Sequence, residues 1–239
     1  MRFECVSRTH VGLKRKINED SVFVDSDRGL WAVADGMGGH DAGEVASSMV
    51  VSALGELPPA QNMDALQAEA VQALRRVNDD LIVLARANGR DSRATIGTTV
   101  VGLAIADDGY RCFWMGDSRA YRLRDGEIIR VSRDHSLVQE LIDAGMLSEE
   151  DAETHENANL ITRAVGVRED ADVATVSGDA QPGDLFLLAS DGLTRMVKDD
   201  EIAAELGRNG LEKAADNLID MVLERGAPDN VSLVITKLV

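Results

Sequence analysis

Short apolar, β-rich runs recur along the chain, and Gly, Asp or Asn residues separate many of them. Runs of this kind, bounded by turn residues, are typical of β-strands. They predict strands over residues 21–24, 30–34, 98–106, 110–115, 120–123, 128–131, 185–189 and 231–238. Short turns join the four runs between residues 98 and 131, so we expect an antiparallel meander there rather than a βαβ repeat.

Three longer segments have helical periodicity instead. The clearest is residues 63–88, where apolar side chains recur every three or four positions and Gly89 follows as a stop. Residues 43–57 predict a second helix, which Pro58 ends. Residues 211–226 predict the third.

Residues 136–165 fit neither pattern. Two short helical segments, 137–144 and 149–154, are followed by a polar stretch, which indicates an insertion beside a sheet. Strands, two long helices, further strands and a last helix predict two sheets covered by helices, an α+β architecture. A chain of 239 residues, 44% of them apolar, can bury a sizeable core, and one domain over residues 1–239 is the simplest organisation.

The charge balance excludes several classes of partner. Acidic residues number 42 and basic residues 25, a net charge of −17, so the surface repels nucleic acid and anionic membranes. Cys5 and Cys112 form no CxxC motif and are expected to be reduced thiols. The first 16 residues contain no apolar signal segment, and the longest apolar stretch, residues 100–106, is too short to span a bilayer. We therefore expect a soluble, cytoplasmic protein without nucleic-acid or membrane partners.

Four acidic clusters lie beside the predicted strands. Each combines a carboxylate with Gly or Asn, and they comprise residues 18–20, 35–39, 190–192 and 229–230. Asp35 and Asp191 follow apolar strands and Asp229 precedes one, so folding can bring these carboxylates to neighbouring strand ends. Oxygen ligands gathered in this way suit a hard cation. For residues 35–39 taken alone, a Gly-rich turn with a local Asp hydrogen bond is the alternative.

The ligand types narrow the choice of metal. Oxygen donors without a Cys motif or a His at ligand spacing favour Mg²⁺ or Mn²⁺ over Zn²⁺, and no EF-hand loop occurs. Carboxylates from several strands can hold two cations about 4 Å apart, and a water that bridges them becomes a hydroxide nucleophile near neutral pH. Arg15 lies close in sequence to residues 18–20 and has the planar fork that binds phosphate, with a surface ion pair as the alternative.

Taken together and in order, these motifs resemble the metal-dependent (PPM, type 2C) serine/threonine protein phosphatases. The matching motifs lie between residues 12 and 234: Arg15, Glu19-Asp20, Asp35-Gly36-Met37-Gly38-Gly39-His40, Gly97-Thr98-Thr99, Gly116-Asp117-Ser118-Arg119, Ser190-Asp191-Gly192 and Asp229-Asn230. The resemblance implies an α-β-β-α sandwich of two mainly antiparallel sheets flanked by helix pairs, with metals at one edge. It also implies that residues 136–165 form the flap that bacterial members carry beside the active site.

The resemblance further implies roles for the acids of the main metal site. Asp35 is expected to bridge two metals, and Gly36 to offer its carbonyl oxygen to one of them. Asp191 and Asp229 are expected to bind the second metal directly.

The remaining implied roles are less direct. Glu19 and Asp20 resemble acids that act mainly through metal-bound waters. Asp117 resembles the ligand of a third, weaker metal in bacterial members, and Arg15 matches the phosphate-binding arginine.

The proton donor is open at the level of sequence. Met37 stands where many eukaryotic members have a His after the Asp-Gly pair. His40, three residues further on, can protonate the leaving alkoxide, because imidazole titrates near neutral pH. A surface or capping role for His40 and proton donation by a water on the third metal are the alternatives.

Other polar residues near the motifs have simpler interpretations. Thr98 and Thr99 are expected to support packing near the site, Arg119 to be structural, and His135 to be solvated or hydrogen-bonded. Ser118 and Ser190 have no partnered His motif, which argues against a nucleophilic serine.

The predicted function is hydrolysis of phosphoserine and phosphothreonine in proteins by in-line attack of a metal-bridging hydroxide. Two Mn²⁺ or Mg²⁺ ions and a weaker third are the expected cofactors. The alternatives are a non-catalytic phosphoprotein-binding module of the same fold and a metal hydrolase for phosphorylated small molecules. We expect a monomer that acts on phosphoproteins made by a eukaryotic-like Ser/Thr kinase, with the flap contacting the phosphoprotein.

Overall fold

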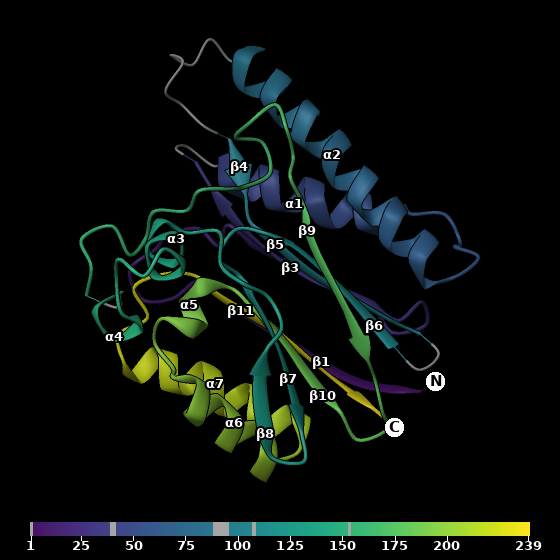
Figure 1. The fold of residues 1–239 in the computed structure, drawn as a ribbon, viewed down its shortest axis with the longest axis vertical. Helices are drawn as coiled ribbons and strands as arrows, with labels where there is room; N and C mark the ends of the chain where they lie inside the picture. Colours follow the sequence, from purple (N-terminus) through teal and green to yellow (C-terminus); the bar gives the residue numbers. More distant parts are fainter. Residues whose placement is uncertain (1, 39–41, 88–95, 107–108, 153) are drawn as a thin grey trace.

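Two antiparallel sheets form the centre of the molecule, and helices cover both outer faces (Figure 1). The computed structural model describes residues 2–38, 42–87, 96–106, 109–152 and 154–239. The first sheet has the order β1-β11-β10-β7-β8, formed by Phe3–His10, Val231–Leu238, Leu185–Ala189, Arg119–Arg124 and Glu127–Arg130. The second has the order β2-β3-β5-β6-β9, formed by Asp20–Asp25, Leu30–Met37, Val100–Ala106, Gly109–Met115 and Ala174–Asp179. The short strand β4, Gly97–Thr98, pairs with β3.

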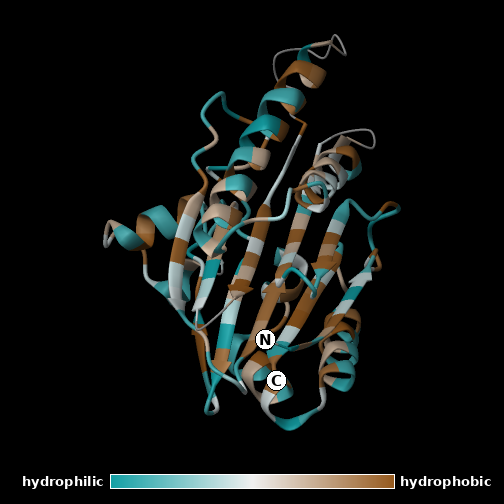
Figure 2. Cartoon of the chain, turned by 90° about the vertical axis from the view of Figure 1, so that its right-hand side faces the viewer, coloured by the Kyte–Doolittle hydropathy of each residue, from teal (hydrophilic) through white to brown (hydrophobic). Residues whose placement is uncertain are grey.

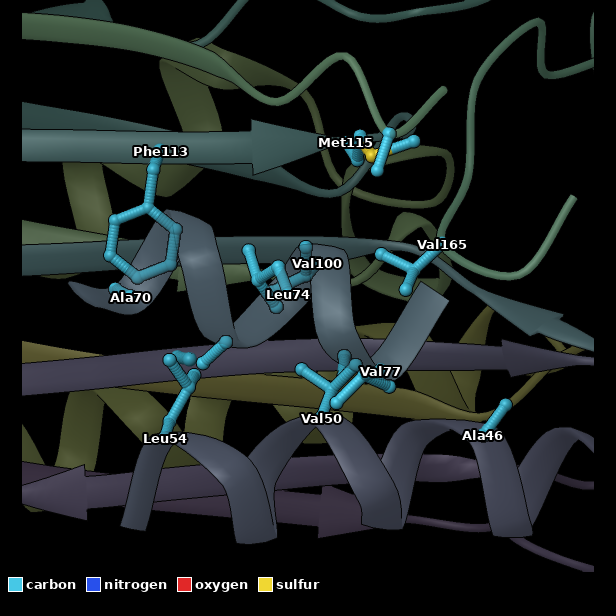
Figure 3. Close-up of a cluster of buried hydrophobic side chains, with 14 of the residues drawn as sticks. Ala46, Val50, Leu54, Ala70, Leu74, Val77, Val100, Phe113, Met115 and Val165 are labelled. Carbon is cyan, nitrogen blue, oxygen red and sulfur yellow. The ribbon is translucent and has the colours of Figure 1, made fainter. Parts of the chain in front are cut away.

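Two long helices cover the outer face of the second sheet. They are α1, Ala42–Gly55, and α2, Met63–Ala87. Their apolar stripes have the periodicity of amphipathic helices and face the sheet. One cluster joins both helices to the strands (Figure 3): Ala46, Val50 and Leu54 of α1, Ala70, Leu74 and Val77 of α2, and Val100 and Phe113 of the sheet.

The other outer face belongs to the C-terminal part of the chain. It is covered by α5, Asp191–Thr194, α6, Asp199–Arg208, and α7, Leu211–Glu224. Ile202 and Leu206 of α6 pack with Leu218 and Val222 of α7 against Ile235 of β11. The two helical layers therefore bury separate apolar clusters.

A third cluster lies between the sheets. Successive residues of a strand point to opposite faces, so Leu30 and Ala32 of β3 face the helices whereas Trp31 and Val33 face the other sheet. Both faces of β3 are therefore apolar, and Figure 2 shows hydrophobic residues along the strands of both sheets. The predicted α-β-β-α sandwich is confirmed.

The structure corrects the predicted meander. Strands β5 and β6 pair in the second sheet, whereas β7 and β8 pair in the first. The chain passes between sheets at Gly116, whose φ of 114° favours glycine. Antiparallel pairing within each hairpin is as predicted, but the four strands do not form one continuous sheet.

Two strands and two helices were not predicted from the sequence. Strands β1 and β9 lie at sheet edges, where few side chains are buried; Val6 is the buried residue of β1. An edge strand can remain polar on its outer side, so it has no apolar run to reveal it. Helices α5 and α6 are short, and α6 buries only Ile202 and Leu206.

The segment predicted as an insertion contains α3, Leu137–Asp143, and α4, Glu149–Ala152. Backbone hydrogen bonds join its two ends, since Leu137 N donates to Leu160 O at 2.9 Å and Thr162 N donates to His135 O at 2.8 Å. Between these ends α3 buries no residue and α4 buries only Ala152. The segment is thus pinned at its base and weakly packed beyond it.

Both cysteines are free thiols, as expected. Burial raises the pKa of Cys5 to about 11 and that of Cys112 further above its usual range, which makes both thiols unreactive. Among the described helices, none combines the length and apolar character needed to cross a bilayer.

Candidate metal centre

The acidic clusters meet at one edge of the sandwich. Asp20 and Asp35 are direct partners in the β2–β3 pairing. Ser190, at the end of β10 in the other sheet, donates a hydrogen bond of 2.9 Å to Asp20 Oδ2. Asp191 follows Ser190, so the contact brings acids of both sheets together.

Two glycines allow the segments of this edge to approach closely. A Cβ at Gly36 would lie 2.1 Å from the carbonyl oxygen of Gly43 in α1, and Gly36 N donates to Glu19 O at 3.1 Å. A Cβ at Gly192 would lie 1.8 Å from Asn230 O. Any side chain at either position would push the acidic segments apart.

Asn230 holds the N-terminal loop against this edge. Its Oδ1 accepts from Glu19 N at 2.8 Å, and its Nδ2 donates to Val11 O and Ile17 O at 2.9 and 3.0 Å. Arg15 lies within the loop held in this way, and its guanidinium donates to Asp229 Oδ2 at 2.7 Å. The predicted phosphate ligand and a predicted metal ligand are therefore in contact.

The backbone of Asp35 is fixed by the two threonines. Asp35 N donates to Thr99 Oγ1 at 3.2 Å, and Thr98 Oγ1 donates to Asp35 O at 2.9 Å. Thr99 Oγ1 also shares a 2.7 Å hydrogen bond with Ser118 Oγ, next to Asp117. Thr98 and Thr99 are buried, which agrees with the expectation that they support packing near the site, and their hydrogen bonds tie Asp35 to the loop that carries Asp117.

Burial of the aspartates and the repulsion between their charges dominate the electrostatics of the acidic edge. Burial raises the pKa of Asp35 well above its usual range, and the charges of Asp20, Asp191, Asp117 and Asp229 raise it further. Burial also raises the pKa of Asp20 to about 6 and that of Asp117 to about 7. The pKa of Asp191 is raised by burial as well, against the opposing charge of Arg195. A cluster of this kind is stabilised by added positive charge.

Arg195 is a member of this site that the sequence analysis missed. Its Nη2 lies 3.0 Å from Asp117 Oδ2 and 2.9 Å from Asp191 Oδ2. The available signal was spacing, because residues i and i+4 share a helix face and Arg195 follows Asp191 by four positions.

The donor set fits hard divalent cations. Every predicted side-chain ligand is a carboxylate, and Asp20 Oδ1 is buried without a hydrogen-bond partner among the described residues. In the described part of the chain, however, no group of three or more His, Cys, Asp or Glu side chains is already arranged to hold a metal ion. Arginines engage Asp229, Asp117 and Asp191, so binding of cations by these acids requires side-chain rearrangement.

The remaining predicted residues lie around the acids. Glu19 Oε1 accepts from Gly43 N at 3.1 Å, at the start of α1. Met37 is half-buried at the end of β3. His40 lies outside the described residues, so its proposed role as proton donor stays a prediction.

Arg119 forms a structural ion pair and His135 is hydrogen-bonded, as expected. Arg119 forms a two-pronged ion pair with Asp134, at 2.8 and 3.1 Å to Oδ2. His135 Nδ1 accepts from Gly116 N at 3.2 Å, and its ring stacks on Trp114 with 6.0 Å between centroids. Burial, followed by the charge of Arg163, lowers the pKa of His135 to about 4, so it is a neutral acceptor at pH 7.

Comparison with known proteins identifies relatives along nearly the whole chain. The model of the protein phosphatase 2C family matches residues 10–230. The serine/threonine protein phosphatase PstP of Mycobacterium tuberculosis is 37% identical over 233 residues, which cover 98% of this chain and 44% of PstP. The chain thus spans less than half the length of that relative.

Solved structures agree. PppA, described as a key regulatory component of T6SS in Pseudomonas aeruginosa, superimposes with a TM-score of 0.90 at 38% identity, covering 99% of this chain and 98% of PppA. The catalytic domain of PstP in complex with two manganese ions gives a TM-score of 0.87 at 35% identity, covering 98% and 97% of the two chains. On both sequence and structure, the chain belongs to the protein phosphatase 2C family.

Proposed function

We propose that the chain is a metal-dependent protein phosphatase that hydrolyses phosphoserine and phosphothreonine in proteins. One observation carries the proposal: five aspartates from distant segments converge on one edge beside Arg15, and burial and mutual repulsion raise the pKa of most of them. Such unfavourable clusters are characteristic of functional sites. Membership of the phosphatase 2C family and the manganese complex of PstP support the reaction class.

Divalent cations are assigned to the acids by position. Asp35, central to the cluster, would contact two Mn²⁺ or Mg²⁺ ions, with the carbonyl of Gly36 beside it. Asp191 and Asp229 would complete the main site, and Asp117 would hold a weaker third ion. When bound, such cations lower the pKa of water to supply the nucleophile and neutralise charge on the phosphoryl group.

Glu19 and Asp20 would act on the cations mainly through metal-bound waters rather than as direct ligands. Glu19 accepts a hydrogen bond from Gly43 N and Asp20 one from Ser190. Oriented carboxylates of this kind fix the waters and ligands around a metal site.

Arg15 would bind the phosphoryl oxygens of the substrate. Its side chain is half exposed and its partner Asp229 is 35% exposed, so the pair can open without unfolding the loop. Because Asp229 would also be a cation ligand, a bound cation would weaken its ion pair with Arg15 and leave Arg15 free to bind the incoming phosphate. Asn230 keeps the loop backbone in place during this exchange.

The remaining assignments concern the leaving group, the protein substrate, the oligomeric state and the cellular compartment. His40 or a water would protonate the leaving alkoxide. The weakly packed segment of α3 and α4 would act as a flap that contacts the phosphoprotein, which a Ser/Thr kinase produces. One copy contains every assigned residue, so a monomer suffices, and the free thiols suit the reducing cytoplasm.

The deciding experiment measures release of phosphate from phosphoserine and phosphothreonine peptides with Mn²⁺, with Mg²⁺ or with a chelator. We expect turnover with either metal and none with the chelator. Turnover that survives chelation would refute the metal-dependent mechanism, and binding of phosphopeptides without turnover would indicate a non-catalytic module. A small aryl phosphate assayed in parallel separates loss of chemistry from loss of protein-substrate recognition.

A further inference from the structure

Arg195 connects three segments that are far apart in the sequence. Its Nη1 donates a hydrogen bond to Oδ1 of Asn159, in the weakly packed segment that follows α4. Its Nη2 contacts Asp117 Oδ2 at 3.0 Å and Asp191 Oδ2 at 2.9 Å. One guanidinium therefore holds a flap residue and two acids of the candidate metal centre, and α3, α4 and α5 lie at the same end of the sandwich (Figure 1).

The geometry makes this contact important for the flap. Backbone bonds pin the flap at its base, near Leu137 and Leu160, whereas α3 and α4 together bury only Ala152. A segment with so few buried apolar contacts opens easily. Its attachment to the acidic edge then depends strongly on polar contacts such as the one between Asn159 and Arg195.

The same guanidinium occupies oxygens that a cation would use. Asp117 Oδ2 and Asp191 Oδ2 both face Nη2 of Arg195. A carboxylate oxygen cannot make a close ion pair with Arg195 and bind a divalent cation along the same direction. Arg195 and a cation therefore compete for these atoms.

We propose that Arg195 acts as a latch, by which we mean that it hydrogen-bonds Asn159 of the flap while it pairs with Asp117 and Asp191. Cation binding at these two acids breaks their contacts with Arg195 and also releases the flap. Arg195 is a positioning residue in this scheme and takes no part in the chemistry. The inference rests on the proposed metal binding at this edge. By thermodynamic reciprocity, whatever loosens the flap contact must also strengthen cation binding.

The test uses the full chain and two readouts other than turnover. Hydrogen exchange of the flap amides is measured with chelator and with saturating Mn²⁺, and Mn²⁺ affinity is measured by calorimetry. In the unmodified protein we expect Mn²⁺ to increase exchange around residues 155–161. Asn159→Ala should show the fast exchange already in chelator and bind Mn²⁺ about threefold more tightly.

The variant Asn159→Ala separates the latch from simple charge effects, because it leaves the charge of Arg195 in place. Arg195→Gln removes both the link and the competing charge, so it should tighten Mn²⁺ binding further, roughly tenfold, within the range typical of coupled sites. The matched control is Arg163→Gln, which removes an equal charge from the flap itself. Arg163 pairs with Asp172 at 2.5 Å rather than with the acidic edge, so both readouts should stay unchanged.

The outcomes distinguish this inference from the proposed function. Absence of Mn²⁺ binding in the unmodified protein would refute the metal centre itself. Normal Mn²⁺ binding with unchanged flap exchange, or an Asn159→Ala variant with unaltered affinity and exchange, would refute the latch alone. Equal effects of Arg163→Gln and Arg195→Gln would show that net charge alone changes Mn²⁺ affinity and flap exchange, and this would also refute the latch.

Discussion

The two ends of strand β10 carry aspartates in opposite electrostatic settings. Asp184, just before the strand, is 1% exposed and accepts two hydrogen bonds of 2.7 Å from Arg124. Arg124 also donates to Asp179 at 2.6 Å. Asp191, just after the strand, lies among four other aspartates, and burial raises its pKa despite the contact with Arg195.

The comparison separates acids that stabilise the fold from acids that serve a site. A buried carboxylate with a two-pronged arginine partner has its charge compensated within the protein. In the acidic cluster, Arg15 and Arg195 compensate only part of the negative charge. Burial still raises the pKa of most of its carboxyl groups, so added cations would stabilise it. The structure therefore tolerates an unfavourable cluster at one end, a cost expected at functional sites.

The largest expected effect is on turnover at the acidic end. Asp35→Asn removes the central carboxylate but keeps its shape, so phosphopeptide hydrolysis at saturating Mn²⁺ should fall by about 100- to 1,000-fold. Thermal unfolding in chelator should occur at the same or a higher temperature, because a repulsive charge is gone. Near-normal turnover in this variant would show that Asp35 is not part of the reaction centre.

Asp117→Asn tests the electrostatic cost directly. The pKa of Asp117 is about 7 in the folded state against 3.8 unfolded, so the folded state binds more protons between these pH values and the contribution of Asp117 to stability falls as pH rises. The variant lacks this titration, so in chelator its stability relative to the unmodified protein should rise by roughly 2–4 kcal/mol between pH 4 and pH 8. Urea unfolding at several pH values measures the difference; a constant difference would contradict the assignment.

At the paired end the effect should be on stability alone. Asp184→Asn leaves Arg124 without its two-pronged partner, and the free energy of unfolding should fall by about 2–3 kcal/mol, measured in urea. Turnover per folded molecule should not change. Asp179→Asn is the matched control, because it touches the same arginine from an exposed position, and its loss should be clearly smaller.

The smallest expected effect concerns Arg15. Arg15→Ala should lower kcat/KM for phosphopeptides by about tenfold, the cost of one charge-assisted contact, without weakening Mn²⁺ binding. Lys16→Ala, a neighbouring exposed cation, serves as the control and should have little effect. An equal loss in both variants would indicate general steering by the basic loop rather than specific phosphate binding.

The fold was largely predictable for segments that bury one entire face, because burial of a face leaves a regular apolar pattern in the sequence. The helix at residues 63–87 and the strands around Trp31 and Leu187 have apolar patterns that survive in the structure. Edge strands β1 and β9 were missed because they bury almost nothing. The division of the predicted meander was missed because both hairpins look alike in sequence, and only their packing partners differ.

The candidate site likewise contains residues that the sequence revealed and one residue that it did not. Asp35, Asp191 and Asp229 were found from their place beside apolar strands, and the motif order identified the family. Arg195 was missed because two of its three partners, Asp117 and Asn159, are 78 and 36 residues away, and its four-residue spacing from Asp191 does not by itself indicate a site. No local pattern records a contact over such a separation.

The sequence by itself determined which segments are apolar on one face, which acids follow strand ends, and which family the ordered motifs match. These properties are local, because backbone periodicity and turn chemistry act over a few residues. Only the tertiary structure decided that β10 carries a compensated pair at one end and a repulsive cluster at the other. The physical reason is that the pKa of a carboxylate depends on burial and on charges brought close by folding, and these come from segments distant in the chain.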